Sequence, residues 1–350
     1  MKTKQLPKDW QEVELGEICE IKKGNSITKN TITNGDIPVI AGGQQPAYYH
    51  NTSNRTGETL TVSGSGAYAG FVAYFNIPIF ASDCSTIQTK SKNVFMKYIY
   101  YFLKGNQNRI YKLQKGMAQP HVYPKDLEKI KIPLPPLSIQ KHIVSILEQA
   151  GALKQKRQDS DKLTKEYLQS VFYEMFLKGK KNTNLKKGKE LFELTYGKGL
   201  SEKERDGGKY PVYGSNGIVG YHSKFLVKGP GIIVGRKGSI GEVNYTKKDF
   251  WPIDTTYYVK PLKKMDFIYL YYLLKSYNLK LNSSTAIPGL NRNEVYNIDF
   301  IDYPLNLQQK FASIVEHVEK LKEKQKQSKE EIDDLFNSLM QKAFNGELVR

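Results

Sequence analysis

The chain has 350 residues, 39% of them hydrophobic, which is enough for two domains because single domains commonly run to about 100–200 residues. Its 53 basic and 35 acidic residues leave a net charge of +18, which indicates a polyanionic partner such as nucleic acid. Two cysteines and five histidines are too few for a zinc framework or a disulfide scaffold, so we expect a reducing, cytoplasmic setting. The sequence has no apolar run of membrane-spanning length and no apolar N-terminal segment, so we expect neither membrane insertion nor secretion.

Residues 1–136 are predicted to form a globular arm of short strands. Its β-branched and aromatic segments are bounded by clusters of Gly, Asn, Pro and Ser, which is typical of strands joined by turns. These strands are expected at residues 37–41, 59–63, 71–75 and 79–81. One amphipathic helix is expected at 96–103, and we interpret its tyrosines as core residues rather than as a platform for bases.

A long helix is expected at residues 137–180. Its apolar residues recur at alternating spacings of four and three, as in a helix that packs against another helix. The first of them are Ile139, Ile143, Ile146, Ala150 and Leu153. At about 1.5 Å per residue the helix is roughly 60 Å long, too long to be buried in its own arm.

A second arm is expected at residues 187–304, after a basic stretch at 178–189 that we interpret as a solvated linker. It repeats the strand-rich character of the first arm. Its predicted strands lie at 210–213, 231–234, 241–245 and 255–259, and its helix at 267–274.

A second long helix, at 305–350, repeats the apolar stripe. We expect the two helices to pair as an antiparallel coiled coil with one arm at each end and approximate two-fold symmetry. The predicted fold is therefore α+β, with two mostly-β domains joined by two long helices. Four side chains near the helix ends are expected to support this pairing or assembly with a partner: Phe172, Phe176, Leu339 and Phe344.

The two halves of the chain repeat one another in sequence. Residues 136–148 align with 304–316 at an offset of 168, with six of 13 positions identical. Further upstream the offset is 171, so that 98–104 align with 269–275. The chain is therefore predicted to be a duplicated unit, in which each arm is followed by its own long helix.

Over essentially its full length the chain resembles the specificity subunits of type I restriction–modification systems. The motifs that carry the resemblance are W-x-x-x-x-L-G at Trp10, Leu15 and Gly16, Pro-Leu-x-x-Gln at 136–140 and 304–308, the helix tails at 167–176 and 335–344, and the duplication. The chain departs from the family pattern in having Ile139 and Leu307 where a glutamate is usual, and in starting the second arm at Leu191 without a tryptophan.

The resemblance implies a division of labour. Each arm would be a target recognition domain that reads one half of a split sequence in double-stranded DNA. The helices would set the spacer between the halves and dock two methyltransferase subunits, and restriction or translocase subunits would join through the complex. A subunit of this kind has no catalysis and no cofactor of its own, and serves DNA methylation and phage defence.

Glycine-rich loops between predicted strands are the first candidates for DNA contact. Only seven of the 53 basic residues are arginines, and the arginine fork binds guanine edges, whereas lysine mainly neutralises phosphates. Arg236 lies in such a loop at 235–241, matched by the loop at 64–70 in the first arm. The residues of this pair that we expect to face DNA are Arg236, Lys237 and Ser239, and Ser65 and Tyr68.

Two further loop pairs are candidates, the first because Gln and Asn side chains can pair with adenine edges and the second because its position is retained in both arms beside variable polar side chains. One comprises Gln44, Gln45 and His50, matched by Ser215, Asn216 and His222. The other lies at 116–121 and 284–292, with Gln119, His121, Asn291 and Arg292. For all three pairs the alternative is a solvated turn or a plain strand connection.

Enzymatic functions fit the sequence less well. Asp9, Glu20 and Lys22 superficially suit a metal-dependent nuclease, but the pattern is degenerate and the second arm lacks it. The Asp/Asn-Pro-Pro-aromatic loop that an adenine methyltransferase needs for a flipped base is absent. Two non-enzymatic alternatives stay open: a specificity protein of another restriction or phage-defence complex, and a coiled-coil adaptor that binds RNA or protein.

Overall fold

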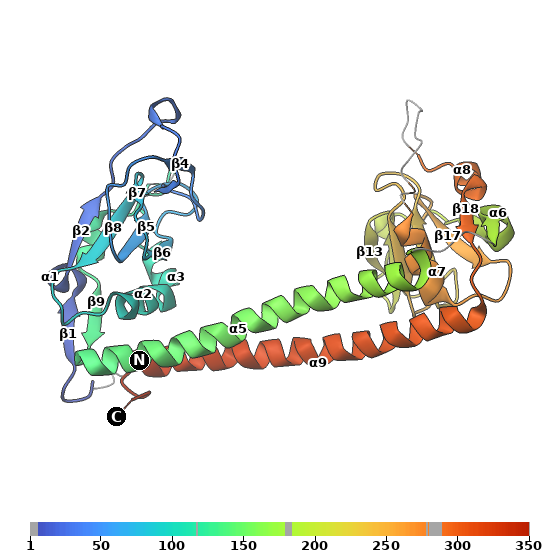
Figure 1. The fold of residues 1–350 in the computed structure, drawn as a ribbon. Coiled ribbons are helices and arrows are strands. Elements are labelled where there is room, and N and C mark those ends of the chain that lie inside the picture. Colours follow the sequence, from blue (N-terminus) through green and yellow to red (C-terminus); the bar gives the residue numbers. More distant parts are fainter. Residues whose placement is uncertain (1–5, 117, 179–183, 278, 280–288, 350) are drawn as a thin grey trace. The chain divides into compact units, whose positions relative to one another are not determined.

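The computed structural model describes residues 6–116, 118–178, 184–277, 279 and 289–349 (Figure 1). The chain divides into two compact units, one of Met1–Asp159 with Lys326–Arg350 and the other of Ser160–Gln325. Each unit holds one mostly-β arm and part of both long helices, so the α+β prediction is confirmed. The domain limits 1–136, 137–180, 187–304 and 305–350 stay a prediction. In the part of the chain just given, no helix is both long and apolar enough to cross a membrane.

The first arm contains a four-stranded sheet of order β2-β8-β5-β6, a three-stranded sheet of order β4-β3-β7 and the pair β1-β9. Its strands are β1 (Gln11–Glu14), β2 (Cys19–Lys23), β3 (Ile37–Ile40), β4 (Tyr48–His50), β5 (Thr59–Ser63), β6 (Val72–Phe75), β7 (Phe80–Ala81), β8 (Cys84–Thr89) and β9 (Lys131–Leu134). Its helices are α1 (Leu15–Ile18), α2 (Met96–Gly105), α3 (Gln107–Tyr111) and α4 (Pro124–Glu128). The core forms where α2 packs on the four-stranded sheet, with Leu60, Ile87 and Ile99 fully buried (Figure 1).

The second arm has the same strand order in its sheets: β11-β17-β14-β15, β13-β12-β16 and the pair β10-β18. Its strands are β10 (Leu185–Lys187), β11 (Phe192–Tyr196), β12 (Tyr210–Gly214), β13 (Gly217–His222), β14 (Gly231–Gly235), β15 (Val243–Thr246), β16 (Trp251–Pro252), β17 (Thr256–Pro261) and β18 (Asp299–Ile301). Its helices are α6 (Gly188–Leu191), α7 (Phe267–Ser276) and α8 (Arg292–Asn297). The repeat seen in the sequence is therefore a repeat of topology.

The long helices are α5 (Leu137–Phe172), which continues into a π-helical turn at Tyr173–Leu177, and α9 (Leu305–Phe344). In the first unit the ammonium of Lys154 lies 2.7 Å from the carboxylate of Asp333. In the second unit the amide of Gln325 donates to the hydroxyl of Thr164 at 3.0 Å. Gly151 lies near Phe336 in the first unit, and Phe172 packs on Phe311 in the second. In each unit residue numbers therefore rise along α5 as they fall along α9, so the helices pair antiparallel, as predicted.

The glutamine of each Pro-Leu-x-x-Gln motif joins a long helix to its arm. Gln140 is fully buried, and its Oε1 accepts the N–H of Phe95 at 2.8 Å, just before α2 begins. Its Nε2 donates to the carbonyl of Pro135 at 2.8 Å. Gln308 likewise accepts the N–H of Asp266 at 2.9 Å, just before α7. The motif therefore ties the start of a long helix to the start of the arm helix.

The aromatic tails of the long helices lie in the arm cores. Phe172 and Phe176 are buried beside Tyr269, and Phe176 also packs on Phe311 at 5.6 Å between ring centroids. Phe344 packs against α2 in the first unit. Phe172 and Phe176 therefore contact α9 through Phe311, as expected for residues that support the helix pair, and they also belong to the core of their unit. Their part in assembly with a partner stays a prediction.

Candidate nucleic-acid interface

Two of the predicted loops of the second arm are neighbours. The loop after β14 carries Arg236, and its tight path depends on Gly235. A Cβ there would lie 2.1 Å from the carbonyl oxygen of Ser239 and 2.9 Å from that of Ser215, so only glycine allows the approach. The exposed side chains beside this contact are Asn216 and Lys237.

The third loop of the second arm reaches the same place. The N–H of Leu290 donates to the carbonyl of Arg236 at 2.8 Å. The guanidinium groups of Arg236 and Arg292 then lie over one ring, with their Cζ atoms 5.1 Å and 5.3 Å from the centroid of Tyr196. Tyr196 is the last residue of β11. Its place in the cluster could not be predicted from the sequence, because it depends on contacts with Arg236 and Arg292, which lie far along the chain.

Tyr257 of β17 anchors this cluster from the sheet. Its ring packs on that of Tyr196 at 5.0 Å, and its hydroxyl donates to the carbonyl of Leu290 at 3.1 Å. Burial, together with the hydrogen bond to Tyr196, raises the pKa of Tyr257 to about 12. The hydroxyl is therefore protonated at neutral pH and stays a donor, which fixes the loop that carries Arg292.

Three loops also meet in the first arm. The N–H of Gly66 donates to the carbonyl of Pro120 at 3.0 Å, and Ser65 forms a β-bridge with His121. The hydroxyl of Ser65 bonds the carboxylate of Asp83. A Cβ at Gly42 would lie 2.6 Å from the carbonyl oxygen of Ser65, which brings the Gln44 loop alongside. The exposed side chains of these loops include Gln44, Gln45, Tyr68 and Gln119.

Two predicted histidines pack inside their arms. His50 is buried, and its Nδ1 accepts the N–H of Thr33 at 3.0 Å. His222 places its Nδ1 3.3 Å from the carboxylate of Asp206 and its ring edge-on to Trp251. Both imidazoles are thus occupied by contacts within the fold, which favours a supporting role over direct contact with DNA.

Asn291 also has a structural role. Its side-chain oxygen accepts the N–H of Asn293 at 3.0 Å and caps the N-terminus of α8. Some predicted positions lie outside the described residues: 117 and 284–288 in the third loop pair, and 179–183 in the basic stretch.

Two of the three residues that suggested a nuclease form a surface ion pair. The ammonium of Lys22 lies 2.8 Å from the carboxylate of Glu20 on β2, and both side chains are about half exposed. In the described parts of the chain, no three His, Cys, Asp or Glu side chains are grouped so that they could hold a metal ion.

The type I restriction modification DNA specificity domain matches the chain twice, at residues 7–164 and 180–334. The chain belongs to this family. The two matches fall on the two halves of the repeat, so the chain carries two DNA specificity domains, and the resemblance inferred from its motifs is confirmed.

Relatives of this specificity subunit include two proteins of Mycoplasma pneumoniae. A type I specificity subunit is 26% identical over 286 residues, which span 75% of this chain and 76% of that protein. The specificity subunit of the type I restriction enzyme MpnII is 30% identical over 150 residues, which span 39% of this chain and 43% of that protein.

Two solved structures share the fold. The crystal structure of a type I restriction–modification S subunit from M. genitalium has a TM-score of 0.63 at 20% identity, covering 97% of this chain and 98% of that chain. A chain from a study of complex assembly and conformational transition in a type I system has a TM-score of 0.66 at 17% identity, covering 98% and 100%.

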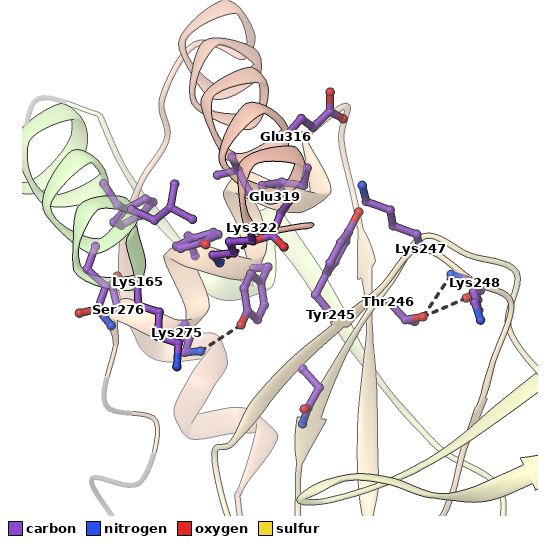
Figure 2. Close-up of a pocket in the computed structure, with 18 of the residues that line it drawn as sticks. Lys165, Tyr245, Thr246, Lys247, Lys248, Lys275, Ser276, Glu316, Glu319 and Lys322 are labelled. Carbon is purple, nitrogen blue, oxygen red and sulfur yellow. Dashed lines mark hydrogen bonds and ion pairs between the residues drawn. The ribbon is translucent and has the colours of Figure 1, made fainter. Parts of the chain in front are cut away.

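A groove of about 1430 Å³ in the second unit of this specificity subunit is lined by tyrosines (Figure 2). Tyr245, Tyr271 and Tyr272 lie along it, with centroid distances of 5.8 Å for the first pair and 5.1 Å for the second. The ammonium of Lys275 donates to the hydroxyl of Tyr271 at 3.0 Å, and Glu319 also borders the groove. Its lining is therefore aromatic with charges of both signs.

The first unit repeats this arrangement at positions 171 residues earlier. Tyr74, Tyr100 and Tyr101 have centroid distances of 5.7 Å and 5.3 Å. We call the two sets the tyrosine triplets. Burial and the neighbouring Glu148 raise the pKa of Tyr101 to about 12, so its hydroxyl is neutral at physiological pH. The triplets are retained in both units, whereas the side chains of the loops predicted to contact DNA differ between the arms.

Exposed apolar residues on the long helices also repeat. Leu153 and Leu321 are 168 positions apart, as are Tyr167 and Leu335, and all four are 48–52% exposed. Leu153 and Leu335 belong to the first unit, and the Lys154–Asp333 pair puts them at the same level of the two helices. Tyr167 and Leu321 are the equivalent pair of the second unit.

Proposed function

We propose that this chain is the DNA-recognition subunit of a type I restriction–modification complex in which each arm reads one half of a bipartite target in double-stranded DNA. The observation that carries the proposal is the meeting of three loops in each arm on the same scaffold but with different side chains. A common scaffold accounts for a common approach to DNA, and different side chains account for different half-sites.

The proposed DNA contacts are the accessible polar residues of these loops. They are Gln44, Gln45, Ser65, Tyr68, Gln119 and His121 in the first arm, and Ser215, Asn216, Arg236, Lys237, Ser239 and Arg292 in the second. His50, His222 and Asn291 support the loops by packing and capping. The net charge of +18 supplies phosphate neutralisation, which makes the affinity for DNA strongly salt-dependent.

The proposed protein partners are two methyltransferase subunits. A partner present in two copies needs two equivalent surfaces. The surfaces retained in both units are the tyrosine triplets and the exposed apolar pairs on the long helices. The helices would also set the spacer between the half-sites, and restriction or translocase subunits would join through the assembled complex.

The chain itself is proposed to be non-catalytic, so methyl transfer to adenine belongs to the partner. Its place of action would be the cytoplasm, where its DNA target lies. Both cysteines are free, buried thiols, which fits a reducing compartment.

Co-expression with the methyltransferase subunits tests the proposal. We expect a complex with two methyltransferase copies for each chain, and a bipartite motif with methylated adenines in the genome of a host that makes both proteins. The chain alone should bind duplex DNA with steep salt dependence and transfer no methyl group. Methyl transfer by the purified chain, or a methylated motif that forms without it, would contradict the proposal.

A further inference from the structure

The ring between Arg236 and Arg292 is positioned by the sheet rather than by a loop. Tyr196 is the last residue of β11 and lies opposite Tyr257 of β17 in the strand register. The next residue, Gly197, is held close to the neighbouring chain, since a Cβ there would lie 2.2 Å from the carbonyl oxygen of Ile253. The ring is about half exposed, so it is fixed at its base and accessible at its face.

Both guanidinium groups lie over the Tyr196 ring and keep their hydrogen-bond donors unused within the described part of the chain. Neither Arg236 nor Arg292 donates a side-chain hydrogen bond to another residue that the structure describes, and both side chains reach solvent. Arg205 of the same arm differs, because its guanidinium donates to the carbonyls of Val219 at 2.9 Å and Leu200 at 3.2 Å. Stacking on Tyr196 leaves the planar forks of Arg236 and Arg292 available for a ligand.

We infer that Arg236 and Arg292 read two guanines in the half-site of the second arm, and that Tyr196 is the positioning residue that pre-orders both forks. This inference rests on the proposed function. Guanine presents O6 and N7 side by side in the major groove, where the two acceptors match a guanidinium fork. A stacked guanidinium loses less conformational freedom on binding than a free one, which strengthens the contact.

The shared ring limits the separation of the two guanines. Both Cζ atoms lie near 5 Å from one centroid, so they are at most about 10 Å apart, or roughly three base-pair steps of about 3.4 Å. Both guanines therefore fall in one half-site. The first arm holds Lys23 at the end of β2 and Ser65 after Gly64, in place of Tyr196 and Arg236, so no equivalent pair of guanines is expected there.

Modified DNA tests the base contact with the protein unchanged. The complex of the full chain with its methyltransferase subunits is assayed on duplexes that carry its methylated motif. Replacing a guanine with 7-deazaguanine removes the N7 acceptor and keeps the base pair. At each of the two guanines we expect methylation to slow about 5- to 50-fold, within the discrimination that a bidentate contact provides. The same replacement in the unspecified spacer is the control and should have no effect.

Four variants separate base reading from phosphate contact and from folding. Arg236→Lys and Arg292→Lys keep the charge and lose the fork, so each should relax the motif at one guanine. Tyr196→Leu removes the aromatic face and should relax both positions, whereas Tyr196→Phe should relax neither. Discrimination at the first half-site should be unchanged in all four, which shows that the complex is intact.

Several outcomes would overturn the inference. The inference is wrong if the half-site read by the second arm contains no guanine. It is also wrong if Arg236→Lys and Arg292→Lys keep full discrimination at both guanines, because the two side chains would then contact phosphates. If Tyr196→Leu leaves discrimination at both guanines unchanged, Tyr196 has no positioning role. All of these outcomes leave the proposed function standing, because they concern how the second arm reads its half-site and not whether the wild-type chain directs methylation to a bipartite motif.

Discussion

Single buried side chains fix how each long helix meets its arm. Gln140 and Gln308 are both buried and both accept the N–H group just before an arm helix. Each also donates to a carbonyl just before its own helix. A leucine of similar size would leave these backbone groups buried and unpaired.

We therefore expect Gln140→Leu to lower the free energy of unfolding by about 1–3 kcal/mol. Urea denaturation followed by circular dichroism measures the change. Gln149→Leu is the matched control, because Gln149 lies exposed on the same helix. Equal effects of the two substitutions would show that the buried contacts contribute no stability of their own.

Local features of the sequence predict some residues of the candidate site but not others. Arg236 could be predicted as a candidate contact because its residue type and its glycine-rich loop are local features. Tyr196 could not, because its role depends on two arginines that approach it through β14 and the start of α8. His50 was predicted to face DNA, yet its hydrogen bond to Thr33, from a separate loop, holds it inside.

Among the structural elements, the helices of ten residues or more were predicted, whereas the short helices and several strands were not. The apolar stripes of α5 and α9 and the helices α2 and α7 are periodic over many residues. Strand β8 was missed because its sequence is mainly polar, although Cys84, Ser85 and Thr86 are buried. The Thr86 hydroxyl bonds the carbonyl of Lys22 in the adjacent strand, a partner that no local pattern reveals.

The long helices are expected to act as a ruler between the half-sites. Four residues added to each helix, after Gln158 and after Lys329, keep the antiparallel pairing because the two sites lie at the same level. The insertion lengthens the rod by about 6 Å, or nearly two base pairs as an upper limit. Genome methylation should then show both half-sites unchanged and a spacer longer by one or two positions.

Adding two residues to each helix at the same sites is the control. This insertion turns the apolar stripes by about 200°, so the helices no longer face each other and assembly should fail. If the four-residue variant still methylates the motif with its original spacer length, something other than the helices sets the distance between the half-sites.

For the whole molecule, duplication predicts two equivalent docking surfaces. Leu153→Glu with Leu335→Glu, both in the first unit, should reduce the complex from two methyltransferase copies to one. The reason is that a buried, unpaired carboxylate disfavours an apolar contact. Native mass spectrometry of the co-expressed complex counts the copies.

Ile77→Glu serves as the comparison, because Ile77 is 49% exposed in the segment between β6 and β7 of the first arm and is not part of a long helix. It should leave both copies bound. Loss of both copies in the Leu153/Leu335 variant would mean that the two surfaces are not independent, and retention of both would place the docking surface elsewhere.

If the two arms read DNA independently, exchanging one arm should change only one half of the target. Residues 187–304 are replaced by the corresponding arm of another family member, and the methylated adenines are mapped in a host that also makes the methyltransferase subunits. We predict a motif in which one half is unchanged and the other is new. A motif altered in both halves, or in neither, would show that the two arms do not read DNA independently.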